Sequence, residues 1–390
     1  MEEQDALMTC AEQARSWLLE HAAPFWSDIG RRPIGLFAER LAHDRTPDEA
    51  YYRVFVQARQ IFAMWAAGTL GWGGDWRGLI EETMTTLLRK ARRDDGFFVH
   101  KLGRDGDVLD ARADLYDQAF VLFALGVSGR ALQDEKYFDE ATYLMGALET
   151  WRHELGGFRE GEIASPHIRR QNPHMHLLEA FWTLYEASGR ECFKRAAIEI
   201  ADLCKNHFIH RPSGALLEYF ADDWNQLNAS PGFTVEPGHC FEWAWLYEKL
   251  AADGVTGSAA ISDGLVGFAR AHGIDPQRGV AINEVDLEGH ILDDKARLWP
   301  QTERLKAGII RFKRTDSAVE AAEVLNAWAG LQRYFHKADQ ALWHDKLQKD
   351  GTFLKELVPA SSLYHIACAI NELWTYAGGG RGVKSSQGKI

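Results

Sequence analysis

The chain has 390 residues, of which 46% are hydrophobic and 26% charged, and its formal net charge is −12. This length and composition can bury a large core, whereas the acidic balance disfavours nucleic acid and anionic membrane as partners, because both favour a basic face. Five scattered Cys residues without a C-x-x-C pair, and a start (MEEQDALMTC) unlike a signal peptide, indicate a reduced cytoplasmic protein.

Apolar segments with helical spacing follow one another along the whole chain, and no apolar run is long enough to span a bilayer. The segments expected to be buried on both sides are 52–69, 115–127, 174–187, 238–251, 318–335 and 363–376. More amphipathic segments lie between them, at 6–22, 77–92, 131–152, 190–207, 259–272 and 338–348. This alternation predicts an inner and an outer ring of helices, an all-α (α/α)6 barrel.

The predicted barrel is one domain over residues 1–377, and the Gly-rich end at 378–390 is expected to be a mobile tail. Long connections with Gly-punctuated alternation lead into the inner helices, for example GFFVHKLGRDGDVLDARAD and RGVAINEVDLEGHILDDKARLW. This pattern is typical of hairpins. Long loops gathered on one face usually build the functional site.

A polar or ionisable residue stands at the start of an apolar helical run six times, at intervals of 58 to 64 residues. These residues are Arg59, Asp117, His176, His239, Glu303 and His365. Six glycines repeat with the same period, 14 to 25 residues earlier, and are Gly35, Gly96, Gly157, Gly214, Gly279 and Gly351. A period near sixty fits a repeated supersecondary unit. Six such units would direct their polar groups into a single pocket at one end of the ring.

Prolines mark several of these helix starts: Pro173 precedes His176, and Pro237 precedes His239. Each histidine would then lie near the positive end of a helix dipole, so we expect a lowered pKa and a neutral imidazole that accepts a proton at pH 7. His174 is about 200° around the helix from His176, so we interpret it as structural.

Two H-x-x-E spacings, His239 with Glu242 and His176 with Glu179, place a carboxylate where it can orient each imidazole. Arg59 lies inside an apolar helix, and we favour a substrate oxygen over a structural ion pair as its partner. Asp117 could be that structural partner.

Zinc or manganese bound by His176, His239, His365 and Glu242 is the main rival interpretation. The chain contains neither a compact H-x-H motif on a strand nor H-E-x-x-H, so we predict no metal and no cofactor. A glycoside hydrolase or lyase would need a pair of catalytic carboxylates, whereas the best candidates here are histidines.

The stretches VFVQARQIF, DLYDQAF, NPHMHLLEAF, EPGHCFEWAWL, LWPQTE and SSLYHI, within residues 50–376, resemble the N-acylglucosamine 2-epimerase family. That family includes cellobiose 2-epimerases and metal-independent mannose isomerases. The resemblance implies an (α/α)6 barrel and proton transfer at C2 of a sugar.

The resemblance also assigns roles to individual residues. It implies that His239 and His365 are the acid/base pair and that His176 opens the sugar ring or holds the open chain. It further implies that Arg59 binds the oxygens of a cis-enediolate and that Glu242 tunes His239. The residues expected to bind substrate are Asn172, Glu179, Tyr116, Asp117, Trp299 and Glu303.

One stretch bears on the choice of substrate. Disaccharide epimerases of this family carry a Trp shortly before the last histidine, whereas this chain has Pro359-Ala360-Ser361-Ser362 there. We therefore predict a D-mannose/D-fructose isomerase that also accepts related aldoses such as lyxose, acting on a monosaccharide as a monomer or homodimer. A sugar 2-epimerase and a non-catalytic sugar-binding protein are the alternatives.

Overall fold

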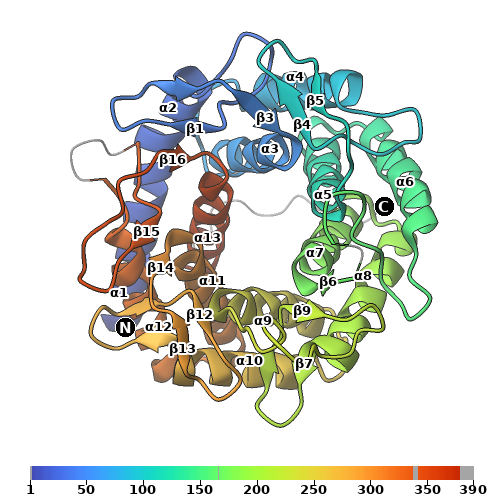
Figure 1. Cartoon of the computed structure of the whole chain (residues 1–390). Coiled ribbons are helices and arrows are strands. Elements are labelled where there is room, and N and C mark those ends of the chain that lie inside the picture. Colours follow the sequence, from blue (N-terminus) through green and yellow to red (C-terminus); the bar gives the residue numbers. More distant parts are fainter. Residues whose placement is uncertain (1, 166, 337–340, 378–390) are drawn as a thin grey trace, which may run out of the picture.

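The computed structural model describes residues 2–165, 167–336 and 341–377, and within these residues two concentric rings of helices surround a common axis (Figure 1). The inner helices are α3 (Val54–Thr69), α5 (Leu115–Leu132), α7 (Gln171–Ser188), α9 (Pro237–Ala252), α11 (Leu298–Thr315) and α13 (Ser362–Ala377). The outer helices are α1 (Glu2–Ser16), α4 (Trp76–Lys90), α6 (Lys136–Leu148), α8 (Glu191–Leu203), α10 (Ser258–His272) and α12 (Ala318–Gln332). Helix α13 packs against α3 and closes the inner ring. The predicted (α/α)6 barrel is confirmed.

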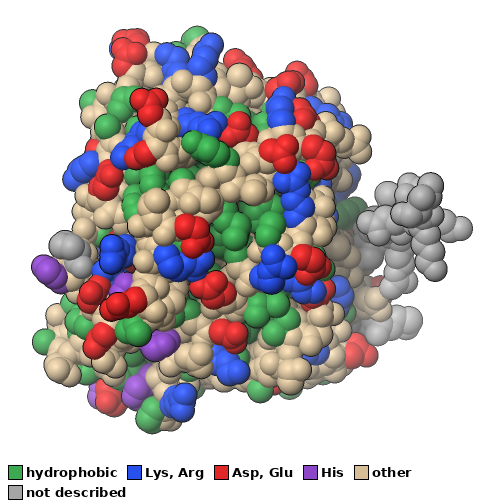
Figure 2. Space-filling model, turned by 90° about the vertical axis from the view of Figure 1, so that its right-hand side faces the viewer, with side chains coloured by type: hydrophobic (Ala, Val, Ile, Leu, Met, Phe, Trp, Pro, Cys, Tyr) green, Lys and Arg blue, Asp and Glu red, His purple; other side chains and the backbone are tan. Residues whose placement is uncertain are grey.

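Shorter helical pieces complete the rings and are η1 (Trp17–Ala22), α2 (Ala23–Asp28), η2 (Glu149–Trp151) and η3 (Cys204–Phe208). The predicted tail at 378–390 lies outside the described residues, and the single-domain organisation stays a prediction. No helix of the described residues is long and apolar enough to cross a membrane. On the flank shown in Figure 2, Lys and Arg side chains are interspersed with Asp and Glu, so this face offers no continuous basic surface.

Short strands precede the inner helices and pair in small antiparallel sheets. Two sheets have three strands each, in the orders β16-β1-β2 and β3-β4-β5, with bounds β1 (Arg40–Leu41), β2 (Pro47–Asp48), β3 (Tyr51–Arg53), β4 (Lys101–Gly103), β5 (Val108–Asp110) and β16 (Val358–Pro359). The remaining strands pair two by two, as β6 (Arg169–Arg170) with β9 (Tyr219–Phe220), β7 (Ile209–His210) with β8 (Ala215–Leu216), β10 (Ile274–Asp275) with β11 (Val280–Ala281), β12 (Glu284–Val285) with β13 (Ile291–Asp293), and β14 (Ala296–Arg297) with β15 (Lys346–Leu347). The β4–β5 and β12–β13 pairs confirm the two hairpins expected from the sequence.

The helix assignment near the end of the chain was wrong in one repeat. The inner helix there is α11, at 298–315, whereas 318–332 forms the outer helix α12, and the described part of 338–348 contains β15 instead of a helix. Helix α11 carries Glu303, Arg304 and Lys306, which are nevertheless buried. Prediction from hydrophobicity alone therefore assigned the Ala-rich segment of α12 to the inner ring, although α12 buries only one face.

The six periodic glycines mark the same turn in every repeat. Their φ angles are 83° at Gly35, 91° at Gly96, 71° at Gly157, 73° at Gly214, 70° at Gly279 and 83° at Gly351. These values lie in the left-handed region, which glycine occupies without steric cost. The period recognised in the sequence is therefore a real structural repeat.

Buried amide side chains of the inner helices form hydrogen bonds with the backbone next to these turns. In three repeats the glutamine amide accepts from a backbone N–H and donates to the carbonyl of the same residue, over 2.7 to 3.0 Å. The pairs are Gln57 with Phe37, Gln118 with Phe98, and Gln301 with Ala281. In a fourth repeat His174 Nε2 accepts from the Phe158 N–H at 3.0 Å, so His174 is structural, as expected.

Candidate active site

A cavity of about 140 Å³ lies where the inner helices begin. Its lining comes from helix starts and the residues just before them, and consists of Arg59, Tyr116, Asn172, His176, Glu236, His239, Glu242, Arg297, Trp299, Ser361, Ser362 and His365. Eight residues predicted from the sequence are therefore brought together. The other three, Asp117, Glu179 and Glu303, do not line the cavity.

His239 is bound by carboxylates other than the predicted one. Its Nδ1 lies 2.9 Å from Glu218 Oε2 and 3.8 Å from Glu236 Oε2. Burial by itself would lower the pKa of His239, but Glu218 and Glu236 raise it to about 10. The expected neutral imidazole is therefore wrong, because Glu218, between β8 and β9, lies close enough to hold the ring as an imidazolium. Glu242 also raises the pKa of His239, but less than Glu218 and Glu236, and the carboxylate that contacts Nδ1 is Glu218.

His365 has the opposite electrostatic environment. Its Nδ1 lies 2.9 Å from Glu303 Oε1, while Glu303 Oε2 lies 2.6 Å from Lys306 Nζ. Burial and the charges of Arg59 and Lys306 hold the pKa of His365 well below its usual range. His365 is therefore neutral at pH 7, as expected, and Glu303 acts on the cavity through this imidazole.

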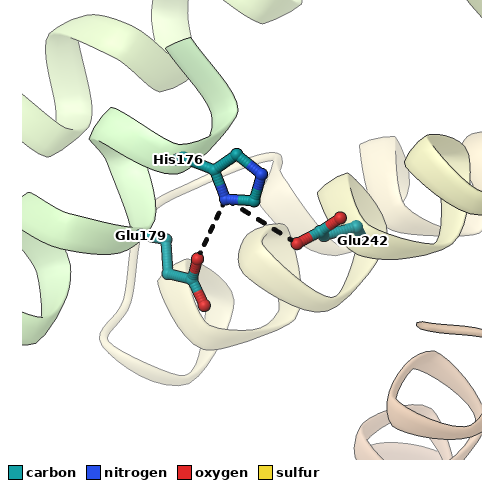
Figure 3. A group of neighbouring side chains, drawn as sticks. All are labelled: His176, Glu179 and Glu242. Carbon is teal, nitrogen blue, oxygen red and sulfur yellow. Dashed lines mark hydrogen bonds and ion pairs between the residues drawn. The ribbon is translucent and has the colours of Figure 1, made fainter. Parts of the chain in front are cut away.

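His176 lies between two carboxyl groups, Glu179 from its own helix α7 and Glu242 from α9 (Figure 3). Its Nδ1 is 3.2 Å from Glu179 Oε2 and 4.0 Å from Glu242 Oε1. Burial lowers the pKa of His176 to about 4, although the Glu179 carboxylate opposes this change. Glu179 also accepts a hydrogen bond from the Tyr364 hydroxyl, which fixes the carboxylate that orients the His176 ring.

Glu242 lines the cavity without a hydrogen bond from any described residue to either carboxyl oxygen. Burial and the neighbouring Glu303 raise the pKa of the Glu242 carboxyl well above its usual range. A neutral carboxylic acid in such a site can donate a hydrogen bond to a ligand.

Arg59 is a buried cation with no carboxylate within 4.0 Å in the described part of the chain. Its Nη2 donates to the Tyr116 hydroxyl at 2.6 Å, and its guanidinium lies 4.3 Å from the Phe120 ring centroid. Because a buried guanidinium requires hydrogen-bond acceptors, this arrangement favours a ligand oxygen over the structural ion pair.

Asp117 neither lines the cavity nor contacts one of its three histidines, in contrast to Glu179 and Glu303. Its Oδ2 lies 2.7 Å from His100 Nδ1, and burial raises the pKa of its carboxyl to about 6. The structural repeat explains the error: Arg59 stands two residues after Gln57, and the residue two after Gln118 is Phe120, which packs against His176. Gln57 and Gln118 occupy equivalent positions in two repeats, so the sequence contained the information that aligns Arg59 with Phe120 and not with Asp117.

Trp299 lies between the two catalytic candidates, with its ring centroid 4.7 Å from that of His239 and 5.8 Å from that of His365. Sequence reasoning missed Glu218, Glu236, Arg297 and Lys306, because nothing in their local spacing indicates which histidine or cavity they approach.

Three histidine and carboxylate groups here bring ligand-type atoms within 4.8 Å of one another, and their members are His176, Glu179 and Glu242; Glu218, Glu236 and His239; and Glu242, Glu303 and His365. Any of these three groups could supply ligands to a metal ion, so the metal interpretation needs an experimental test.

Comparison with known proteins gives a consistent assignment. Residues 35–369 match the N-acylglucosamine 2-epimerase family. A protein of Rhizobium meliloti named mannose-6-phosphate isomerase is 36% identical over 93% of this chain and 96% of its own length, and the D-mannose isomerase of Thermobifida fusca is 28% identical over 65% and 66%.

Solved structures agree on the fold. A D-mannose isomerase superposes with a TM-score of 0.85 at 19% identity, covering 94% of this chain and 97% of its own. The cellobiose 2-epimerase of Bacillus thermoamylovorans superposes with a TM-score of 0.84 at 20% identity, covering 93% and 98%. The chain therefore belongs to the N-acylglucosamine 2-epimerase family and is an enzyme of this group of sugar isomerases and epimerases.

Proposed function

We propose that the protein is an aldose–ketose isomerase that interconverts D-mannose and D-fructose by proton transfer, without a metal ion. One observation carries the proposal: His239 and His365 share a cavity, and their pKa values are displaced in opposite directions. A pair of titratable groups separated in this way supplies an acid and a base at the same pH.

In the proposed reaction, neutral His365 removes the proton from C2 of the open-chain aldose. The electron pair forms the C1–C2 double bond, and the charge that develops on O1 is stabilised by the Arg59 guanidinium. The His239 imidazolium protonates O1, and the neutral imidazole that results takes the proton of the O2 hydroxyl, which restores the imidazolium. Return of the C2 proton to C1 then yields the ketose, so that no atom or electron is gained or lost.

The remaining groups assist this sequence. His176, oriented by Glu179, serves ring opening and holds the open chain, and Glu242 donates a hydrogen bond to a sugar oxygen. Asn172, Tyr116 and Trp299 line the same cavity and contact the sugar. Glu303 positions His365, and Asp117 makes no substrate contact, because it faces His100.

A sugar 2-epimerase is the second candidate, since the same enediolate gives an epimer when the proton returns to C2 from the opposite face. The absence of an aromatic residue at 359–362, where Ser361 and Ser362 line the cavity, favours a monosaccharide substrate. The relatives named as mannose and mannose-6-phosphate isomerases favour the isomerase. Lyxose as a further substrate, a cytoplasmic location and a monomer or homodimer belong to the same proposal.

The test is incubation with D-mannose, D-glucose, N-acetylmannosamine and cellobiose, separately and in D₂O, with products identified by chromatography and NMR. We expect fructose from mannose, with deuterium at C1, because a histidine in an open pocket exchanges its proton with solvent. Epimers labelled at C2 would support the second candidate. Quantitative retention of the original C2 hydrogen in fructose over many turnovers would contradict the enediolate route.

A further inference from the structure

A second cavity, of about 310 Å³, adjoins the catalytic one. The two cavities share Arg59, Tyr116, Arg297 and Ser361, so a ligand in the first can extend into the second. We call the second one the mouth cavity, because several of its lining side chains reach solvent, with Arg297 43% exposed. Arg40, Arg53 and Lys346 also line it, so that with Arg59 and Arg297 five cations share the wall with two carboxylates, Asp345 and Glu356.

Arg297 and Lys346 are held opposite each other by the backbone. They are register partners in the antiparallel pair of β14 and β15, and both side chains line the mouth cavity. Like charges directly across a strand pair repel each other and destabilise the pairing. An anion bound between the two side chains would remove this repulsion.

Arg297 and Lys346 keep free hydrogen-bond donors, although a carboxylate lies near each of them. Asp345 Oδ2 lies 3.6 Å from Arg297 Nε, which makes no hydrogen bond to any described residue, and Glu356 Oε2 lies 3.0 Å from Lys346 Nζ. Because a guanidinium carries five N–H donors and an ammonium three, both groups keep donors for a ligand.

Of the other three cations of the wall, Arg59 is assigned to the enediolate, and Arg40 and Arg53 are held by carboxylates. Arg40 donates from Nε and Nη2 to Asp48, and Arg53 donates to the buried carboxylate of Glu39. Arg297 and Lys346 are therefore the cations in this wall best placed to meet an anionic substituent.

We infer that the mouth cavity binds a phosphate group on the carbon of the hexose furthest from the carbonyl, and that Arg297 and Lys346 are its ligands. This inference rests on the proposed function, since it names the class of sugar that the isomerase takes. The reacting carbons lie between the histidines, and the phosphate lies outward beside the β14–β15 pair. Arg and Lys are the side chains that recognise phosphate oxygens most directly.

The test compares mannose and mannose 6-phosphate as substrates for the wild-type protein, Arg297→Gln, Lys346→Met and the double variant. We expect the wild-type kcat/KM to favour the phosphorylated sugar by about 10²-fold, and each single variant to reduce that preference by about 10-fold, as for a lost charge-assisted hydrogen bond. Arg104→Gln is the matched control, since Arg104 is 72% exposed, paired with Glu49 and outside both cavities. This control should keep the wild-type preference.

Calorimetric binding of mannose 6-phosphate, mannose and inorganic phosphate separates the two proposals. If wild type converts neither hexose, but binds mannose 6-phosphate tightly and loses that binding in both single variants, the isomerase proposal fails and the phosphate site stands. If wild type isomerises mannose without preferring the phosphorylated sugar, or both variants keep the wild-type preference, the phosphate site is overturned and the isomerase stands. Inorganic phosphate should bind wild type more tightly than Lys346→Met.

Discussion

The two ends of the barrel each contain a cavity lined by charged side chains, and the larger cavity lies at the end without the histidines. The cavity between the C-terminal halves of α7, α9, α11 and α13 measures about 850 Å³, against about 140 Å³ where the helices begin. Size alone would select the end opposite the three histidines.

The two cavities also differ in how their charged side chains are paired. At the larger cavity two of the three lining cations have carboxylate partners: Arg314 Nε lies 2.8 Å from Glu248 Oε2, and Lys249 Nζ lies 3.6 Å from Glu186 Oε2. At the smaller cavity, Arg59 Nε and both carboxyl oxygens of Glu242 have no hydrogen-bond partner among the described residues, and all three histidines have displaced pKa values. Unsatisfied and perturbed buried groups, which cost stability, are the mark of the functional end.

Replacing the two histidines should give the largest effect in this comparison. We expect His239→Ala and His365→Ala each to lower kcat for mannose isomerisation by at least ~10²-fold, the usual contribution of a general acid or base. Circular dichroism should show a folded protein in both cases. Lys249→Met, at the opposite end, is the control and should keep kcat near the wild-type value. Near-normal turnover in either histidine variant would remove that residue from the acid/base pair.

Arg59→Lys should have the next largest effect. The substitution keeps the charge but loses the two-pronged donor geometry that matches a pair of oxygens. We expect kcat to fall by roughly 10-fold or more with a smaller change in KM, because the negative charge exists in the enediolate and not in the bound sugar. A change confined to KM in steady-state kinetics would mean that Arg59 binds only the ground state.

Glu218→Gln tests the carboxylate that holds His239. Removing the negative charge destabilises the imidazolium, so the pKa of His239 must fall from about 10. The alkaline limb of kcat/KM against pH should therefore move down by roughly 1–3 pH units, the range for loss of one opposite charge. Glu236→Gln, at 3.8 Å instead of 2.9 Å, should move it less. An unchanged alkaline limb in both variants would exclude His239 as the acid that this limb reports.

Chelation should have the smallest effect. Because we assign proton transfer to side chains alone, dialysis against EDTA should leave kcat and KM for mannose unchanged. Loss of activity that zinc or manganese restores would instead identify one of the histidine and carboxylate groups as a metal site. Metal content measured before and after dialysis would then show how many ions the protein holds.

The sequence by itself determined the architecture and brought most of the predicted site residues to one end of the barrel. Glycine turns, prolines before helices and apolar runs are local signals, and each acts on the residues next to it. Repeated six times, they specified the rings and brought His176, His239, His365 and Arg59 to one cavity. The same local signals failed at α11, because its charged residues are buried in ion pairs, Lys306 with Glu303 of the same helix and Arg304 with Glu323 of α12.

Only the tertiary structure decided which groups meet. The sixth residues of α3, α7 and α11 are Arg59, His176 and Glu303, all buried, and in α5 that position belongs to Phe120 and not to Asp117. Glu218 reaches His239 across 21 residues, and Glu303 reaches His365 across 62. Such pairs depend on how the loops return to the ring, and the charge state of each histidine depends on the pair. The path of the chain therefore raised the pKa of one imidazole and lowered that of the other.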